Sequence, residues 1–133
     1  MGLSITALSP SYLDIQRAAD AERFRALVVA DGDTRVAIAA VVDYGFAVLY
    51  AATVFAFFGA PRRFRIGCWL VAAGAVFDEV ENTFVLIGVL APESFTDGDV
   101  EWMTRFGLFK SISLILGALA LVGAEVRARI ADR

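Results

Sequence analysis

Residues 66–90 read IGCWLVAAGAVFDEVENTFVLIGVL, and this stretch decides the fold. Apolar residues lie on every side of a helix over most of its length, which is the pattern of a segment surrounded by lipid or protein. At 1.5 Å per residue, about 25 residues are enough to cross a hydrocarbon core of about 30 Å. The stretch therefore predicts a membrane-spanning helix, although it carries three acids and an asparagine: Asp78, Glu79, Glu81 and Asn82.

Two further apolar stretches lie on either side of it. Residues 36–58 are broken only by Asp43, and residues from about 106 to 126 carry Lys110. The overall composition agrees, because 59% hydrophobic residues and a mean hydropathy of +0.68 exceed what soluble domains show. We predict an all-α integral membrane protein whose three-helix transmembrane domain, residues 35–133, has spans at about 36–58, 66–90 and 106–126.

The N-terminal segment, residues 1–34, has a different pattern. Between Ser9 and Ala30 apolar residues recur at helical spacing, and charged residues occupy the other side. We expect one amphipathic helix, capped by Ser9, that lies at the membrane surface or against the bundle without crossing. Two D-G-D triplets, at residues 31–33 and 97–99, are expected to mark the boundaries where the next helices begin.

Charge in the two links between the spans predicts the orientation. The first link is basic, with Arg62, Arg63 and Arg65. The second link is acidic, with Glu93, Asp97, Asp99 and Glu101. Because basic loops stay on the cytoplasmic side, we expect the N-terminus outside, the C-terminus in the cytoplasm, and a location in the cell (inner) membrane.

Composition also excludes several kinds of site. Histidine is absent and Cys68 is the only cysteine, so one chain cannot form a Ser-His-Asp triad, a His-ligated haem or a Cys/His zinc site. No metal site is predicted, and the residues identify no cofactor. A net charge of -3 without a basic stripe does not favour nucleic acid as a partner.

Acids within a membrane span are costly. A charge at a helix centre costs roughly 2.5–3.5 kcal/mol, while each Leu, Ile, Phe or Val returns about 0.3–0.6 kcal/mol. Three acids therefore cost about 8–10 kcal/mol, which is more than the apolar residues of 66–90 supply. This helix is expected to need partner helices that bury its acids.

Helix geometry sorts these acids by direction. At 100° per residue, Asp78, Glu81 and Asn82 share one face. Glu79 is rotated by about 100° from Asp78, so we expect it to point toward a second copy of the chain or a water-filled cleft.

Counting residues inward from the outer boundary places Asp43, Glu81 and Lys110 at similar depth, with Asp78 about one turn deeper. Tyr50 could reach Asp78 from the first span. We predict a functional polar cluster of Asp43, Asp78, Glu81, Asn82 and Lys110, with Tyr50 and Glu79 as secondary residues. Our first hypothesis is that Lys110 pairs with Glu81, Asp78 or Asp43.

Lys110 is the only lysine in the chain, and a buried lysine shifts its protonation readily, which suits proton exchange or Schiff-base chemistry. The alternative is that it only neutralises the acids of the second span. We assign no catalytic residue.

The motif Asp78-Glu79-Val80-Glu81-Asn82 resembles the D-x-x-E-N helix of small uncharacterised bacterial multi-pass membrane proteins. A lysine early in the last span, as at Lys110, is similar too. The resemblance implies a bacterial inner-membrane location and carries no activity with it.

Three functions remain open. The first is a protein that binds or conducts a proton, cation or small solute as a homo-oligomer, with Gly107-x-x-x-Ser111 or the Gly67/Ala75 side as contact surfaces. The second is a membrane enzyme that uses carboxylate acid/base residues on a lipid or isoprenoid, recognisable by an apolar groove opening sideways to lipid. The third is an accessory subunit of a larger membrane complex, with Glu79 as a docking residue.

Overall fold

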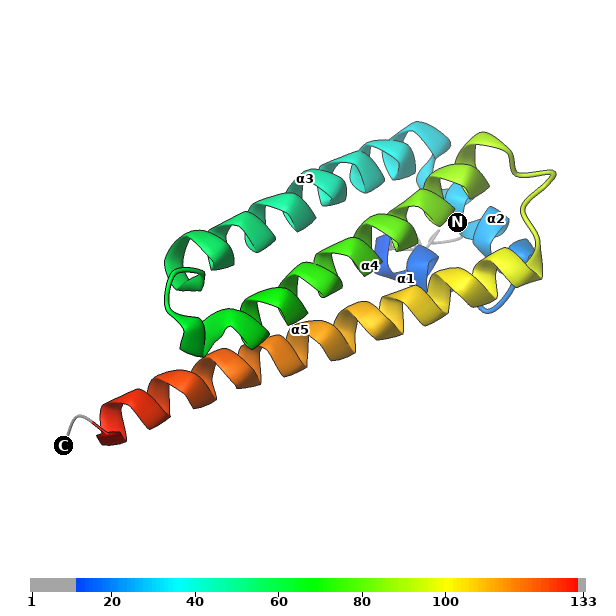
Figure 1. The fold of residues 1–133 in the computed structure, drawn as a ribbon. Coiled ribbons are helices and arrows are strands. Elements are labelled where there is room, and N and C mark those ends of the chain that lie inside the picture. The colour runs from blue at the N-terminus through cyan, green and yellow to red at the C-terminus, as the bar shows by residue number, and fades with distance from the viewer. Residues whose placement is uncertain (1–11, 132–133) are drawn as a thin grey trace, which may run out of the picture.

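The computed structural model describes residues 12–131, and every regular element in that range is a helix (Figure 1). The elements are α1 (Tyr12–Gln16), α2 (Ala21–Asp31), α3 (Asp33–Phe58), a 3₁₀ turn η1 (Arg62–Phe64), α4 (Arg65–Leu90) and α5 (Asp97–Ala131). The all-α class is therefore confirmed. The ends of α3 and α4 agree with the predicted spans within three residues.

Three long helices make the body of the molecule. α4 packs against both α3 and α5, and α5 projects past its neighbours at its C-terminal end (Figure 1). α5 has 35 residues, about 52 Å at 1.5 Å per residue, so it begins before the predicted span and continues after it.

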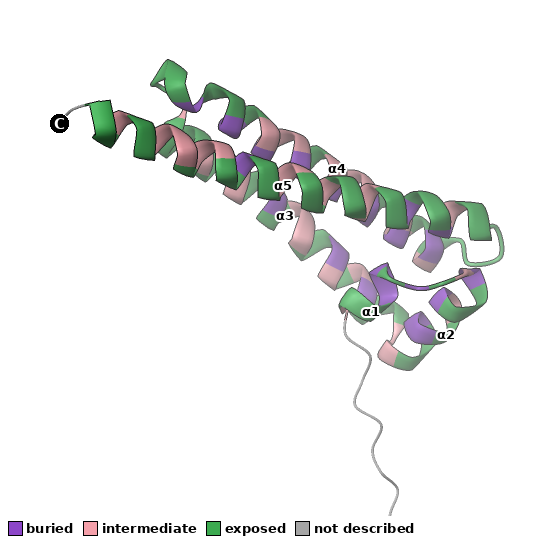
Figure 2. Cartoon of the chain, turned by 90° about the horizontal axis from the view of Figure 1, so that it is seen from below, coloured by how far each residue is buried: buried purple, intermediate pink, exposed green. Residues whose placement is uncertain are grey.

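α3 and α5 are long and apolar enough to cross a membrane. Their large apolar side chains point outward: Val42, Leu49 and Ile115 are each at least 60% exposed. Exposed positions follow the outer sides of both helices in Figure 2. A core helix of a soluble protein would bury such residues, so this surface fits contact with lipid or with a partner protein.

The expected single helix between Ser9 and Ala30 is wrong. The chain leaves helical geometry after Gln16 and re-enters it at Ala21. Asp20 causes the restart, because its Oδ1 accepts a hydrogen bond from the Arg23 backbone N–H at 2.7 Å and caps α2. The predicted cap at Ser9 lies outside the described residues.

The two short helices, α1 and α2, pack against the bundle. This was one of the two positions expected for the N-terminal segment, the other being the membrane surface. Phe24 of α2 is fully buried and stacks beside Phe95, with ring centroids 4.7 Å apart. Gly88 of α4 makes room for it, since a Cβ there would lie 2.5 Å from the Phe24 ring. Asp97 also accepts the Ala21 backbone N–H at 2.9 Å, which ties α2 to the start of α5.

Both D-G-D triplets lie at helix boundaries, as expected. Gly32 joins α2 to α3 with φ of 95°, a conformation that favours glycine. In the first turn of α5, Asp99 accepts hydrogen bonds from the backbone N–H and the hydroxyl of Thr96, at 2.8 and 2.7 Å. These bonds hold the pKa of the Asp99 carboxyl below its ordinary value.

Glycines bring α4 and α5 into close contact. A Cβ at Gly67 would lie 2.6 Å from Leu121, and one at Gly74 would lie 2.8 Å from Leu114. Gly67 therefore faces α5 of the same chain, so it does not provide the contact surface between copies that we expected.

Candidate functional site

Lys110 of α5 lies between two acids of α4. Its Nζ is 2.9 Å from Oδ1 of Asp78 and 2.6 Å from Oε2 of Glu81. Both acids are 4% exposed, and the Lys110 side chain is 19% exposed. The hypothesis that Lys110 forms a buried ion pair with Glu81 or Asp78 is therefore confirmed.

Asn82 connects this ion pair to α3 and α1. Its Nδ2 donates to Oδ2 of Asp43 at 3.1 Å and, more weakly, to Oδ1 of Asp78 at 3.5 Å. Its Oδ1 accepts from the Tyr12 hydroxyl at 2.8 Å and from Gln16 Nε2 at 3.3 Å. A fully buried amide thus uses both of its N–H groups and both lone pairs of its oxygen.

α3 supplies two groups. Asp43 joins the cluster through Asn82, whereas the ion pairs of Lys110 are with Asp78 and Glu81. The hydroxyl of Tyr50 lies 3.5 Å from Oδ2 of Asp78, at the outer limit of a hydrogen bond. The five predicted cluster residues and Tyr50 are therefore brought together, as helical periodicity and depth counting along the helices predicted.

Glu79 lies apart from the other acids. It makes none of the contacts described above, and within the described part of the chain its Oε1 is buried without a hydrogen-bond partner. This placement agrees with the direction that helix geometry predicts. Whether it faces a second copy or a cleft stays a prediction.

Sequence reasoning missed the contribution of α1. Tyr12 and Gln16 are one helical turn apart, so they share a face and both reach Asn82. Burial and the nearby carboxylates raise the pKa of the Tyr12 hydroxyl above its ordinary value, so it acts as a donor. The sequence does contain a signal: Tyr12 and Gln16 are four residues apart and lie next to the apolar Ile15, which is buried against the bundle.

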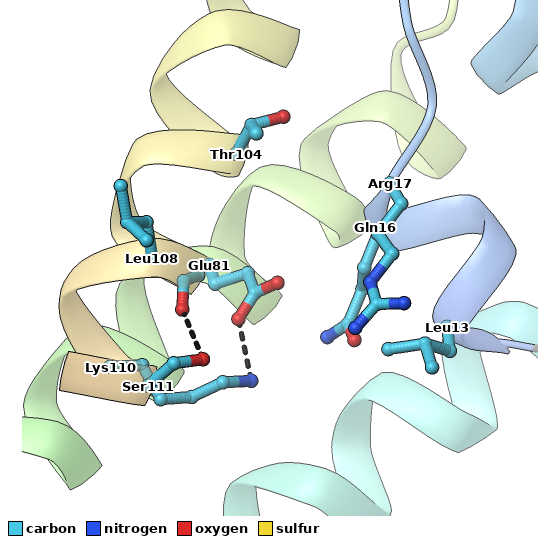
Figure 3. Close-up of a pocket in the computed structure, with 9 residues that line it drawn as sticks. Leu13, Gln16, Arg17, Glu81, Thr104, Leu108, Lys110 and Ser111 are labelled. Atoms are coloured by element: carbon cyan, nitrogen blue, oxygen red, sulfur yellow. Dashed lines mark hydrogen bonds and ion pairs between the residues drawn. The ribbon is translucent and has the colours of Figure 1, made fainter. Parts of the chain in front are cut away.

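A pocket of about 260 Å³ opens beside the ion pair, between α1 and α5. Figure 3 shows Gln16, the last residue of α1, and Arg17, which follows it, extending into the space in front of Glu81 and Lys110. The remaining lining residues are Leu13 of α1 and Thr104, Gly107, Leu108 and Ser111 of α5.

Gly107 supports the site within the chain. A Cβ at this position would lie 2.8 Å from Oε1 of Glu81, so the carboxylate packs directly on the α5 backbone. Ser111 donates to the Gly107 carbonyl at 2.9 Å. The Gly107-x-x-x-Ser111 surface therefore lines the pocket, although we expected it to join copies of the chain.

The charge balance indicates what this arrangement can do. Asp78 and Glu81 pair with Lys110, and Asp43 joins them through Asn82, so the cluster has a net charge of -2 if all four groups are ionised, one positive against three negative. In a site of low dielectric, such an excess favours uptake of a proton or another cation. Among the described residues, no group of three His, Cys, Asp or Glu side chains is placed to hold a metal ion.

No protein-family model, curated protein or solved structure matches the chain.

Proposed function

We propose that this is a small multi-pass membrane protein whose buried cluster binds or conducts a proton, a cation or a small solute. The observation that carries the proposal is a buried cluster inside a bundle with an apolar exterior, in which Asp78 and Glu81 pair with the ammonium of Lys110 and Asp43 joins them through Asn82. Ionisable residues in this setting commonly form relays or solute sites. The adjoining pocket gives the cluster access to a ligand.

The proposal includes α4 as the third span. α4 has 26 residues, as α3 does, and packs along both of its neighbours. Its acids Asp78 and Glu81 are turned inward, which removes most of the cost of placing them in lipid. Basic residues of η1 lie near the C-terminal part of α5, where Arg63 is 4.0 Å from Glu125, and this end is proposed to be cytoplasmic.

The topology can be tested by labelling single cysteines in intact cells, after Cys68 is replaced by serine. A cysteine at Arg62 is expected to be protected from an impermeant reagent, and one at Glu93 is expected to react. Labelling of both, or of Arg62 alone, would contradict three spans in this orientation.

Proton movement can be measured with a pH-sensitive dye inside vesicles that contain the purified protein. Glu81→Gln and Asp78→Asn are expected to reduce flux to the level of protein-free vesicles. Glu101→Gln is the matched control, because Glu101 is exposed and pairs with Arg105 away from the cluster. Flux that is unchanged in both cluster variants would refute the proposal for protons, and the same vesicles can then be tested with alkali cations.

The alternative of a membrane enzyme acting on a lipid or isoprenoid is favoured by one observation. Leu13 and Leu108, which flank the pocket, are 49% and 57% exposed, so the pocket opens beside apolar side chains on the outside of the bundle. Glu81 and Lys110 at its base could serve as acid/base and electrostatic groups. Chemical change of an added lipid, lost in Glu81→Gln, would favour this alternative over transport.

The proposed homo-oligomer remains a prediction. The pocket and the cluster are complete within one chain, so assembly is not needed to form them. The measurement that tests it is the mass of the protein in lipid nanodiscs or mild detergent.

A further inference from the structure

We infer that the pocket between α1 and α5 binds the anionic head group of a single-tailed or lipid-like amphiphile, and that the cluster behind it takes up a proton when the anion binds. The inference rests on the proposed function, because it requires the pocket to lie within a membrane and the cluster to accept a proton.

The polar lining favours an anion. Arg17 extends into the pocket, and among the described residues its guanidinium makes no ion pair or hydrogen bond. Lys110 has three N–H donors, of which two face Asp78 and Glu81, so one remains for a ligand. Guanidinium and ammonium groups at one pocket are the groups that bind carboxylate, phosphate or sulfonate oxygens.

The size and the rim favour a head group that carries a tail. About 260 Å³ is below the roughly 300–1,000 Å³ of pockets that enclose a whole small molecule. A head group therefore fits inside, and the rest of the ligand has to lie outside. The half-exposed side chains of Leu13 and Leu108 provide an apolar surface at that opening.

The charge count links the anion to a proton. With Arg17 included, two positive groups stand against three carboxyl groups, so the site has a net charge of -1 before the ligand enters and -2 afterwards if nothing else changes. Uptake of one proton restores the original charge. The titratable and charged groups that face this site are Tyr12 of α1, Arg17 directly after α1, Asp43 and Tyr50 of α3, Asp78 and Glu81 of α4, and Lys110 of α5. Glu79 lies apart from them and is not counted.

The test is equilibrium binding of labelled dodecanesulfonate, at trace concentration, to the full-length protein in phosphatidylcholine nanodiscs. A sulfonate keeps its charge across the pH range, so any pH dependence comes from the protein. We expect saturable binding that is at least about tenfold weaker in Arg17→Gln, because a charge-assisted hydrogen bond is lost. Arg105→Gln is the matched control, since Arg105 lies on α5 outside the pocket lining and pairs with Glu101.

Two comparisons test the chemical class. Dodecanol, which has the tail without the charge, is expected not to displace the probe. Methanesulfonate, which has the charge without the tail, is expected to displace it only at concentrations at least about a hundredfold higher. Displacement by methanesulfonate at concentrations equal to those of dodecanesulfonate would assign the pocket to a free anion from water and overturn the amphiphile.

The proton link has its own readout. Binding is expected to tighten from pH 8 to pH 6, by up to about tenfold per pH unit if one proton enters with each anion. Asp43→Asn keeps an acceptor for Asn82 and removes one negative charge, so it is expected to tighten binding at pH 8 and to reduce the pH dependence. Binding that is independent of pH in the parent protein would refute the link.

If Arg17→Gln does not fold, Thr104→Asp provides a second test, because a negative charge in the pocket lining is expected to weaken binding. Unchanged affinity in either folded variant would overturn the site. Proton flux that depends on Glu81 without any binding of dodecanesulfonate would refute this inference alone. If dodecanesulfonate binds as expected and proton flux is unaffected by Glu81→Gln, proton conduction by the cluster is refuted and the anion site is supported.

Discussion

Replacing Lys110 with methionine is expected to destabilise the folded bundle by about 3–5 kcal/mol, the cost of removing one partner from a buried ion pair. Asp78 and Glu81 would then face each other at 4% exposure without the ammonium that lies 2.9 and 2.6 Å from them. A loss of about 3 kcal/mol lowers the ratio of folded to unfolded protein more than a hundredfold.

The insertion of α5 into the membrane is expected to become more favourable in Lys110→Met, although the folded bundle becomes less stable. An isolated helix that exchanges Lys110 for Met no longer carries the roughly 2.5–3.5 kcal/mol cost of a lysine at the membrane centre. Lys110→Met should therefore insert at least as well as the parent protein while its bundle unfolds more easily. The two steps are separable, because helix insertion precedes helix association in membranes.

The assay for the bundle is reversible unfolding in mixed micelles by titration with dodecyl sulfate. Arg105→Met is the control, since the exposed pair of Arg105 with Glu101 contributes only about 0–1 kcal/mol. The triple variant Asp78→Asn, Glu81→Gln, Lys110→Met is expected to recover most of the loss, because neutral replacement of a whole buried pair is often neutral or stabilising. Lys110→Met as stable as the parent, or a triple variant no better than Lys110→Met, would refute the ion pair.

Gly107→Ala is expected to destabilise the bundle by about 1–3 kcal/mol through overpacking, since a Cβ there would lie 2.8 Å from the carboxylate of Glu81. A Cβ at Gly123, on the same helix, would have nothing within 4 Å. Because alanine has a higher helix propensity than glycine, the Gly123→Ala bundle is expected to be as stable as the parent or more stable by up to about 1 kcal/mol. Asp99→Asn is expected to cost about 0.3–1 kcal/mol at pH 7, because it removes a negative charge from the first turn of α5. The Thr96 bonds lower the pKa of Asp99, so its stabilisation is present above the ordinary value of 3.8 and is lost as the pH falls through the lower folded-state pKa.

These three variants are checked by the same unfolding titration, for Asp99→Asn at pH 7 and again at pH 3. Equal stability of Gly107→Ala and Gly123→Ala would show that Glu81 does not need the space beside Gly107. A stability difference between Asp99→Asn and the parent protein that is as large at pH 3 as at pH 7 would contradict the role of the ionised Asp99 carboxyl.

Helical periodicity and depth counting predicted a large part of the site. Asp78 and Asn82 differ by four residues and therefore share a face, and Lys110 lies at the depth of Glu81. These regularities hold because a membrane-spanning helix has a fixed rise and rotation per residue. For the same reason, the ends of α3 and α4 could be predicted from apolar length.

The contribution of α1 could not be predicted in this way. Tyr12 reaches Asn82 only because the chain breaks after Gln16 and folds α1 back onto α4, a contact across 70 residues. The restart depends on the capping bond of Asp20, which is one of six charged residues on the polar side of the expected helix. Periodicity averages over such a residue, so it predicts one helix where two exist.

The amide of Asn82 has a direction that its neighbours impose. Ionised carboxyl groups can only accept hydrogen bonds, so Asp43 and Asp78 hold the NH₂ side of the amide toward themselves and leave its oxygen for Tyr12 and Gln16. If the Asp43 oxygen that faces Asn82 carried a proton, its O–H group would point at the N–H group of Asn82, and two donors would meet. The amide relieves this by turning over, and Tyr12 then has to accept where it now donates, while the amide of Gln16 has to turn as well. Protonation of the cluster would in this way be transmitted to α1 by one side chain that never carries a charge itself.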